Sequence, residues 1–209
     1  MADFESLAQN VVAGKEAQVK EQVQEFIKVG AEPLDIINQG LIAGMNIVGP
    51  RFKAGDMFVP EVLMSAKAMA SGIALVKPLI TDTDLPAMGT IVLGTVKGDL
   101  HDIGKNLVGM LLESGGFKVV NLGIDIAPEG FVQAVKEHKA DIVAMSALLT
   151  TTMTGMKDTI ELMKEEGLNV KCIVGGAPIS KDYANQIGAD GFAPDAASAV
   201  DLCKELLSA

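Results

Sequence analysis

Five short apolar runs, each followed by a segment with helical periodicity, fill the chain from residue 89 onward and restrict its fold more than any other feature. The first run, TIVLGTV at residues 90–96, is rich in β-branched residues and shows no polar alternation. Such runs are typical of strands buried on both faces of a parallel sheet, in which each crossover needs a helix. The other predicted strands are 117–123, 140–148, 170–176 and 191–194, and the predicted helices are 102–115, 128–138, 153–166, 180–187 and 196–207. We therefore predict a five-stranded, parallel, doubly wound α/β domain of the flavodoxin-like or Rossmann-like class over residues 89–209.

The N-terminal part of the chain follows a helical period instead. In EAQVKEQVQEFIKVG (16–30), Val19, Val23 and Phe26 fall on one helical face. Similar spacing at 34–48 and 60–80, with a short opening helix near 3–13, predicts a four-helix bundle over residues 1–82. The pattern breaks in TDTDLPAM (81–88), within which we place a linker at residues 83–88.

Charge and composition argue against several classes of partner. The formal net charge is −10, and aromatic residues make up 4% of the chain with no Trp. Such a chain repels a phosphate backbone and has few rings on which bases could stack, so we expect no nucleic acid partner. The N-terminal segment has acidic residues and no apolar run, and we see no stretch of about 18 apolar residues. We expect no membrane partner and a cytoplasmic location.

Small, hydroxyl and acidic residues follow the predicted strands. In a doubly wound sheet the carboxyl ends of the strands form one rim, and ligands bind there. The segments that reach this rim are KGDLHD (97–102), SALLTTT (146–152), GGAP (175–178) and APDAAS (193–198).

Two common ligand classes of such sheets lack the residues that they need. Gly94, Gly98 and Gly104 do not have the G-x-G-x-x-G spacing of a dinucleotide site. A phospho-receiver domain would need an aspartate and a lysine near the places where Ser146 and Pro194 stand.

His101 is one of only two histidines in the chain. A lone histidine in a loop is more often a hydrogen-bonded bystander than a ligand. Asp99, however, can hold one ring nitrogen of His101 and leave the other free to bind a metal. No cluster with zinc-like spacing surrounds the pair. A single histidine backed by a carboxylate suits a metal whose other positions are filled by a macrocycle.

The segment from Asp99 to Gly104, DLHDIG, matches the D-x-H-x-x-G signature of cobalamin-binding domains. The later motifs S-x-L at 146–148 and G-G at 175–176 stand at the intervals that this family shows. Residues 44–69 are similar to the helical cap of the methionine-synthase branch. Over nearly its whole length, the chain resembles the small corrinoid proteins of systems that demethylate methanol, methylamines, quaternary amines or aryl methyl ethers.

The resemblance implies a cobalamin cofactor, as methylcobalamin, cob(I)alamin or a related corrinoid. His101 would be the lower axial ligand of cobalt, with Asp99 and Thr152 extending the relay behind it. Phe52 and Val59 in the helical cap would cover the methyl-bearing face. The other residues that would contact the cofactor and its nucleotide tail are Lys97, Gly98, Leu100, Gly104, Ser146, Leu148, Thr150, Gly175, Gly176 and Ala196.

The resemblance also implies a function. The chain would be a methyl carrier, not catalytic alone, that accepts a methyl group on Co(I) through a substrate-specific methyltransferase. A second methyltransferase would pass the group to tetrahydrofolate or coenzyme M, and a reductive activase would be a further partner. A cobalamin-dependent sensor or regulator and the small subunit of an adenosylcobalamin mutase are the alternatives. The donor is not specified, because that choice belongs to the partner.

Overall fold

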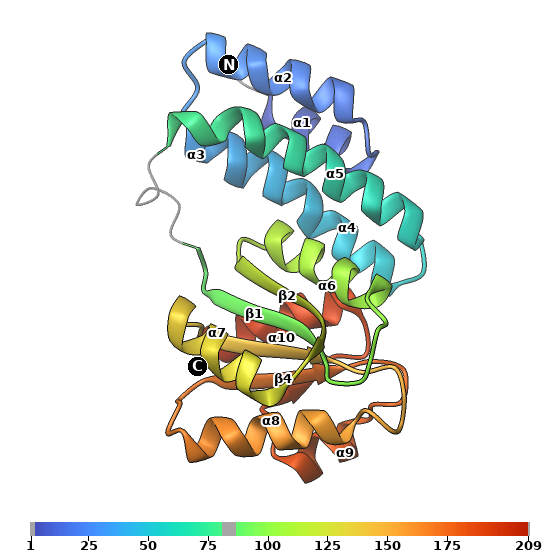
Figure 1. Ribbon diagram of the computed structural model, residues 1–209. Coiled ribbons are helices and arrows are strands. Elements are labelled where there is room, and N and C mark those ends of the chain that lie inside the picture. Colours follow the sequence, from blue (N-terminus) through green and yellow to red (C-terminus); the bar gives the residue numbers. More distant parts are fainter. Residues whose placement is uncertain (1–2, 81–86, 209) are drawn as a thin grey trace. The chain divides into compact units, whose positions relative to one another are not determined.

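The computed structural model describes residues 3–80 and 87–208. Residues 83–86 of the predicted linker lie outside this description. The chain separates into two compact units, one helical and N-terminal, the other an α/β unit that begins after Pro86 (Figure 1).

The helical unit has four main helical segments, as the sequence predicts. Its third segment is one continuous helix with a π-helical stretch in the middle, and it extends five residues beyond the predicted end at residue 48. The elements are α1 (Phe4–Val12), α2 (Glu16–Lys28), α3 (Pro33–Asp35), η1 (Ile36–Ile42), α4 (Ala43–Lys53), α5 (Val59–Val76) and the 3-10 turn η2 (Lys77–Leu79).

The apolar face predicted for the second helix forms part of the core of this unit. Val19, Val23 and Phe26 of α2 are all buried, because residues three and four apart share one side of a helix. The π-helical stretch η1 packs closely on α1, where a side chain at Gly40 would overlap Leu7. The glycine lets η1 approach α1 this closely without displacing the Leu7 side chain.

The α/β unit is a five-stranded, all-parallel sheet with the order β2-β1-β3-β4-β5, so the predicted fold class is confirmed. This is the flavodoxin-like order that the sequence indicates. Its strands are β1 (Thr90–Val96), β2 (Lys118–Ile126), β3 (Ile142–Ser146), β4 (Lys171–Gly175) and β5 (Gly191–Phe192). Its helices are α6 (Ile103–Ser114), α7 (Pro128–His138), α8 (Thr154–Glu165), α9 (Lys181–Ile187) and α10 (Ala196–Ser208).

Helices cover both faces of this sheet, which explains why the strands are apolar without alternation. Leu112 of α6 and Cys203 of α10 pack on one face. Phe131 of α7, Met156 of α8 and Ala184 of α9 pack on the other. The connections place the carboxyl ends of all five strands at one rim.

Register aligns the strand ends that matter for a ligand. Thr95 of β1 pairs with Ser146 of β3, and Ser146 pairs with Gly175 of β4. Three of the predicted rim segments therefore begin side by side.

Strand β2 runs to Ile126, three residues beyond its predicted end. Its register against β1 shifts twice, once between Leu93 and Gly94 and again between Gly94 and Val96. Each shift adds a residue to β2, as a β-bulge does. The bulged end of β2 reaches the loop that follows β1.

Among the described residues, one helical stretch is long and apolar enough to cross a membrane by length and composition alone. It is Val59–Leu79, with 39% of its most apolar window buried inside the protein. The helix carries Glu61 and Lys67 among its apolar residues, so it is not the uninterrupted apolar run that the sequence analysis considered, and the core helix of a globular bundle meets the same criterion.

Replacing Phe131 by alanine should test the larger core of the α/β unit. The Phe131 side chain is fully buried between α7 and the sheet, so Phe131→Ala should lower the free energy of unfolding by about 3–5 kcal/mol. Urea denaturation measures the change, with Gln133→Ala on the exposed side of α7 as the control. A loss below about 1 kcal/mol would contradict this account of the core.

Candidate functional site

Asp99 lies at the centre of the rim, in the loop between β1 and α6, and its side chain is fully buried. Its Oδ1 accepts from the His101 backbone N–H at 3.1 Å and lies 2.7 Å from His101 Nδ1. Its Oδ2 accepts from the backbone N–H of Leu148 at 2.7 Å, from that of Leu149 at 3.3 Å and from the Thr152 hydroxyl at 2.8 Å. Protein donors therefore occupy both oxygens, as a buried carboxylate requires.

These hydrogen bonds decide the charge of Asp99. Burial alone would raise the pKa of its carboxyl group, because a charged form is costly away from water. The donors from Leu148, His101 and Thr152 outweigh burial and hold the pKa of Asp99 well below its usual range. Asp99 is an anion in the folded protein.

The same contacts fix the tautomer of His101. A carboxylate can only accept hydrogen bonds, so Nδ1 of His101 must carry the proton that joins the two side chains. In a neutral imidazole the other nitrogen, Nε2, then keeps its lone pair. The His101 side chain is 52% exposed, whereas that of Asp99 is 0% exposed. The arrangement presents one oriented imidazole nitrogen at the surface.

Thr152 completes the support of Asp99. Its Oγ1 lies 2.8 Å from Asp99 Oδ2 and 2.9 Å from the carbonyl oxygen of Leu149. A hydroxyl has one proton and can donate to only one of these acceptors at a time. The anionic carboxylate is the stronger acceptor, so the structure brings the predicted trio Asp99, His101 and Thr152 together in one hydrogen-bonded chain.

Two residues that the sequence analysis missed hold the loop around His101. The hydroxyl of Thr95, which is fully buried at the end of β1, donates to the His101 carbonyl oxygen at 2.9 Å. The Gly98 N–H donates to Asp125 Oδ1 at 2.7 Å. Thr95 gives no sequence signal, because threonine is an ordinary strand residue. Asp125 lies beyond the predicted end of its strand.

The remaining predicted residues of the α/β unit lie at the strand ends, in the loops that follow them, or in the first turns of α6 and α10. Gly98 has φ +81°, a conformation that favours glycine. At Gly176 a side chain would overlap the carbonyl oxygen of Ala147, so the chain itself requires this glycine. Leu148 contributes its backbone N–H to Asp99, a role that the sequence did not indicate. Lys97, Thr150 and Leu148 are exposed, Ser146 and Gly175 are half-buried, and Ala196 is buried at the start of α10.

The surface beside His101 suits a large, flat, mostly apolar group. Leu100 is 67% exposed and Ile103 84% exposed, on either side of the histidine in sequence. Gly104 faces open space, with no protein atom near the position of a side chain. An exposed ligand nitrogen with apolar neighbours and an open glycine fits a metal macrocycle.

Phe52 and Val59 belong to the helical unit, in α4 and at the first residue of α5. Phe52 is half-buried and Val59 is exposed. Their predicted contact with the upper face of the cofactor stays a prediction.

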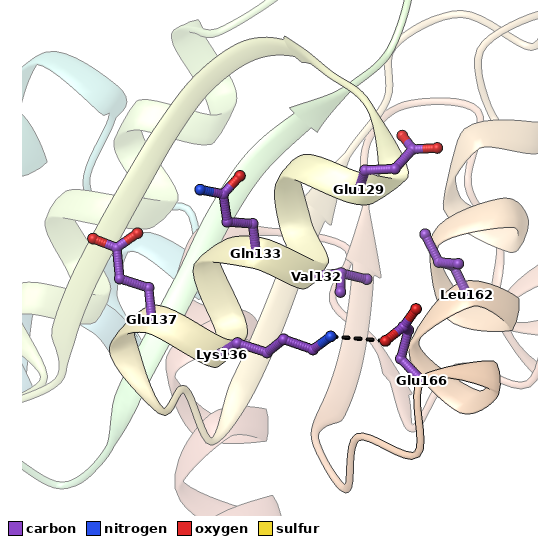
Figure 2. A pocket seen from close by; sticks show the side chains of 7 residues that line it. All are labelled: Glu129, Val132, Gln133, Lys136, Glu137, Leu162 and Glu166. Atoms are coloured by element: carbon purple, nitrogen blue, oxygen red, sulfur yellow. Dashed lines mark hydrogen bonds and ion pairs between the residues drawn. The ribbon is translucent and has the colours of Figure 1, made fainter.

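A surface hollow between α7 and α8 does not include any predicted site residue (Figure 2). Five of its side chains come from α7, and Lys136 reaches across to Glu166, just after the end of α8, in an ion pair of 2.7 Å. Its lining consists of Glu129, Val132, Gln133, Lys136, Glu137, Leu162 and Glu166. Exposed ion pairs of this kind contribute little to the free energy of folding. Because none of the predicted site residues lines this hollow, we assign the functional site to the rim.

Fold and site together place one oriented histidine, backed by a buried carboxylate, at the strand ends of an α/β sheet, which is where such sheets bind their ligands. Within residues 3–80 and 87–208, no group of three or more His, Cys, Asp or Glu side chains is arranged to hold a metal ion. His101 is the residue of this rim suited to reach a metal inside a macrocycle.

Comparison with known proteins identifies the family. Models described as B12 binding domain match residues 89–201 and residues 3–77. A corrinoid protein of Desulfitobacterium hafniense is 43% identical over 99% of this chain and 98% of its own length. Dimethylamine corrinoid protein 3 of Methanosarcina acetivorans is 46% identical over 99% of this chain and 100% of its own length. A chain in the crystal structure of the methanol:cobalamin methyltransferase complex from Methanosarcina barkeri matches with a TM-score of 0.88 and 34% identity, covering 97% of this chain and 78% of that one.

The chain belongs to the B12-binding-domain family of corrinoid proteins, and its cofactor is a cobalamin-type corrinoid.

Replacing the Thr152 hydroxyl should destabilise the site even without cofactor. Thr152→Val keeps the shape of the side chain but takes one donor from the buried Asp99 carboxylate. We expect a loss of about 1–3 kcal/mol in the free energy of unfolding, with most of it restored in Thr152→Ser. Chemical denaturation of the cofactor-free chain measures this, and Thr154→Val at the exposed start of α8 is the control. Equal stability of Thr152→Val and wild type would show that the hydroxyl does not support Asp99.

Proposed function

We propose that this chain is a methyl carrier of a corrinoid methyltransferase system, and that His101 is the lower axial ligand of its cobalt. The observation that carries the proposal is the hydrogen bond of 2.7 Å between Asp99 and His101 Nδ1. It orients the ring and leaves Nε2 as a ligand, which is how metal-binding histidines are commonly held. Similarity to corrinoid proteins over nearly the whole of this chain, one of them from a methanol:cobalamin methyltransferase complex, supports a methyltransferase partner.

The bound corrinoid supplies a cobalt centre that can accept a methyl group and give it up to a nucleophile. The protein's residues orient and tune this centre. His101 Nε2 would bind the cobalt, while the proton on His101 Nδ1 is donated to Asp99, whose negative charge stabilises positive charge on the ring. Leu148 N–H and the Thr152 hydroxyl hold Asp99 in place. Because these donors come from the segment after β3, the axial ligand is positioned by two separate loops of the sheet.

A carrier has to meet more than one enzyme. We infer a substrate-specific methyltransferase that loads the methyl group and a second methyltransferase that moves it to tetrahydrofolate or coenzyme M. A reductive activase completes the proposed set of partners. For the donor we propose a methylated amine, on the strength of the 46% identity to the dimethylamine corrinoid protein of Methanosarcina acetivorans.

Removal of the imidazole should change the environment of the cobalt without abolishing binding. His101→Ala is expected to bind corrinoid, to lose the nitrogen splitting from the protein in the electron paramagnetic resonance spectrum of Co(II), and to transfer methyl groups at least about tenfold more slowly. His138→Ala, which replaces the only other histidine of the chain, is the matched control. A His101→Ala spectrum identical to that of wild type would refute the axial assignment.

The donor is tested by loading the corrinoid-bound chain with partner enzymes of different specificity. We expect methylation with a dimethylamine-specific methyltransferase to be at least about tenfold faster than with a methanol-specific one, since partner choice rests on differences in binding free energy. Transfer of isotope-labelled methyl groups to the chain measures both rates. Faster loading from methanol would contradict the proposed donor alone, whereas no loading from any methyl donor would contradict the carrier function.

A further inference from the structure

Asp125, at the bulged end of β2, contacts the loop that presents His101 but belongs to none of the motifs described above. Its Oδ1 accepts from the Gly98 N–H at 2.7 Å, and its own N–H donates to the Asp99 carbonyl oxygen at 3.1 Å. The two hydrogen bonds lie on either side of the peptide that joins Gly98 to Asp99. Asp125 therefore holds the main chain of Gly98 and Asp99, the segment that carries the buried carboxylate.

The backbone of Asp125 is strained in order to make these contacts. Its φ is +56°, and the only other residue outside glycine with a positive φ in the described chain is Lys139. Aspartate and asparagine adopt this left-handed region at lower cost than most residues. Strain of this kind gathers at functional sites, where the surroundings enforce it.

The two bulges of β2 bring Asp125 to this position. At the first bulge, Asn121 Oδ1 accepts from the Gly123 N–H at 3.0 Å and from the buried Lys105 ammonium at 2.6 Å. Lys105 lies on α6, close after His101 in sequence. The bulged strand is thus tied both to the helix that follows the histidine and to the loop that precedes it.

We propose that Asp125 is a positioning residue for the His101 ligand, through the main chain of Gly98 and Asp99. The proposal rests on the proposed function, because it takes His101 as the axial ligand. Leu148 and Thr152 hold the Asp99 side chain from the loop between β3 and α8, and Asp125 holds the Asp99 backbone from β2. If one of these contacts is removed, the Asp99 carboxylate remains buried, but the position of the His101 imidazole relative to the strand ends is no longer fixed.

Three substitutions of Asp125 separate the effect of losing the Oδ1 acceptor from the effect of the strained backbone. Asp125→Asn keeps an oxygen acceptor and tolerates the left-handed backbone. Asp125→Gly removes the acceptor but relieves the strain, and Asp125→Ala removes the acceptor and keeps the strain. Lys139→Ala is the matched control, because it places alanine at the other left-handed residue, at the end of α7.

Two measurements on the full-length chain report on the loop. Without cofactor, amide hydrogen exchange of Gly98 should become about tenfold faster in Asp125→Gly and Asp125→Ala, and should stay within about twofold of wild type in Asp125→Asn and Lys139→Ala. With corrinoid bound as Co(II), the ratio of histidine-coordinated to uncoordinated cobalt, read from nitrogen splitting, should fall about tenfold in the same two variants.

The outcomes are distinct. Asp125→Gly indistinguishable from wild type in both measurements would overturn the proposal, as would an Asp125→Asn variant that loses as much as Asp125→Gly. For a variant that takes up no corrinoid, the exchange measurement alone is used, and unchanged exchange at Gly98 overturns the proposal because Asp125 then does not hold this loop. If His101→Ala also leaves the cobalt spectrum unchanged, the axial role of His101 is refuted. If His101→Ala changes the spectrum and Asp125→Gly does not, only the positioning role of Asp125 is refuted.

Discussion

The buried carboxylate of Asp99 is the interaction on which the rim depends. A carboxylate with no exposed surface is stable only if protein donors replace water at both oxygens. Asp99 receives them from its own loop through His101 and from the segment after β3 through Leu148 and Thr152. The two loops cannot move apart without leaving an anion unsatisfied, so one side chain ties together segments that are distant in sequence.

Parallel register makes this connection possible. Because Thr95, Ser146 and Gly175 pair in one row, the loops after β1, β3 and β4 leave the sheet at the same height. At Gly176 the close packing of these loops, rather than contact with a cofactor, explains the small residue. A side chain at Gly176 would strike the backbone of Ala147. Gly104 is the opposite case, because no protein atom restricts it and the space beside it is open.

The parts of the site that could be predicted are those set by short sequence distances. Asp99 and His101 are two residues apart, so their pairing can be read from the motif, and the strand ends follow from apolar runs. The role of the Leu148 N–H could not be read in this way, because a backbone donor has no sequence signature and its partner lies on another loop. Asp125 was missed for a different reason. Its position depends on two bulges in β2, and register shifts arise from pairing between strands, which a single strand's pattern does not record.

The contrast in exposure between Asp99 and His101 explains how the rim can be ready for its cofactor. Folding of the chain already offsets the cost of burying the carboxylate, because its donors are backbone and side-chain groups of the protein. The His101 imidazole that is hydrogen-bonded to it stays half exposed, in a single tautomer whose Nε2 has a free lone pair. If His101 binds the cofactor as proposed, little further ordering of its side chain is needed, and the entropic cost of that ordering is avoided. A histidine without the buried aspartate would present either ring nitrogen in many orientations, so the pair rather than the histidine alone would set the geometry of the proposed ligand.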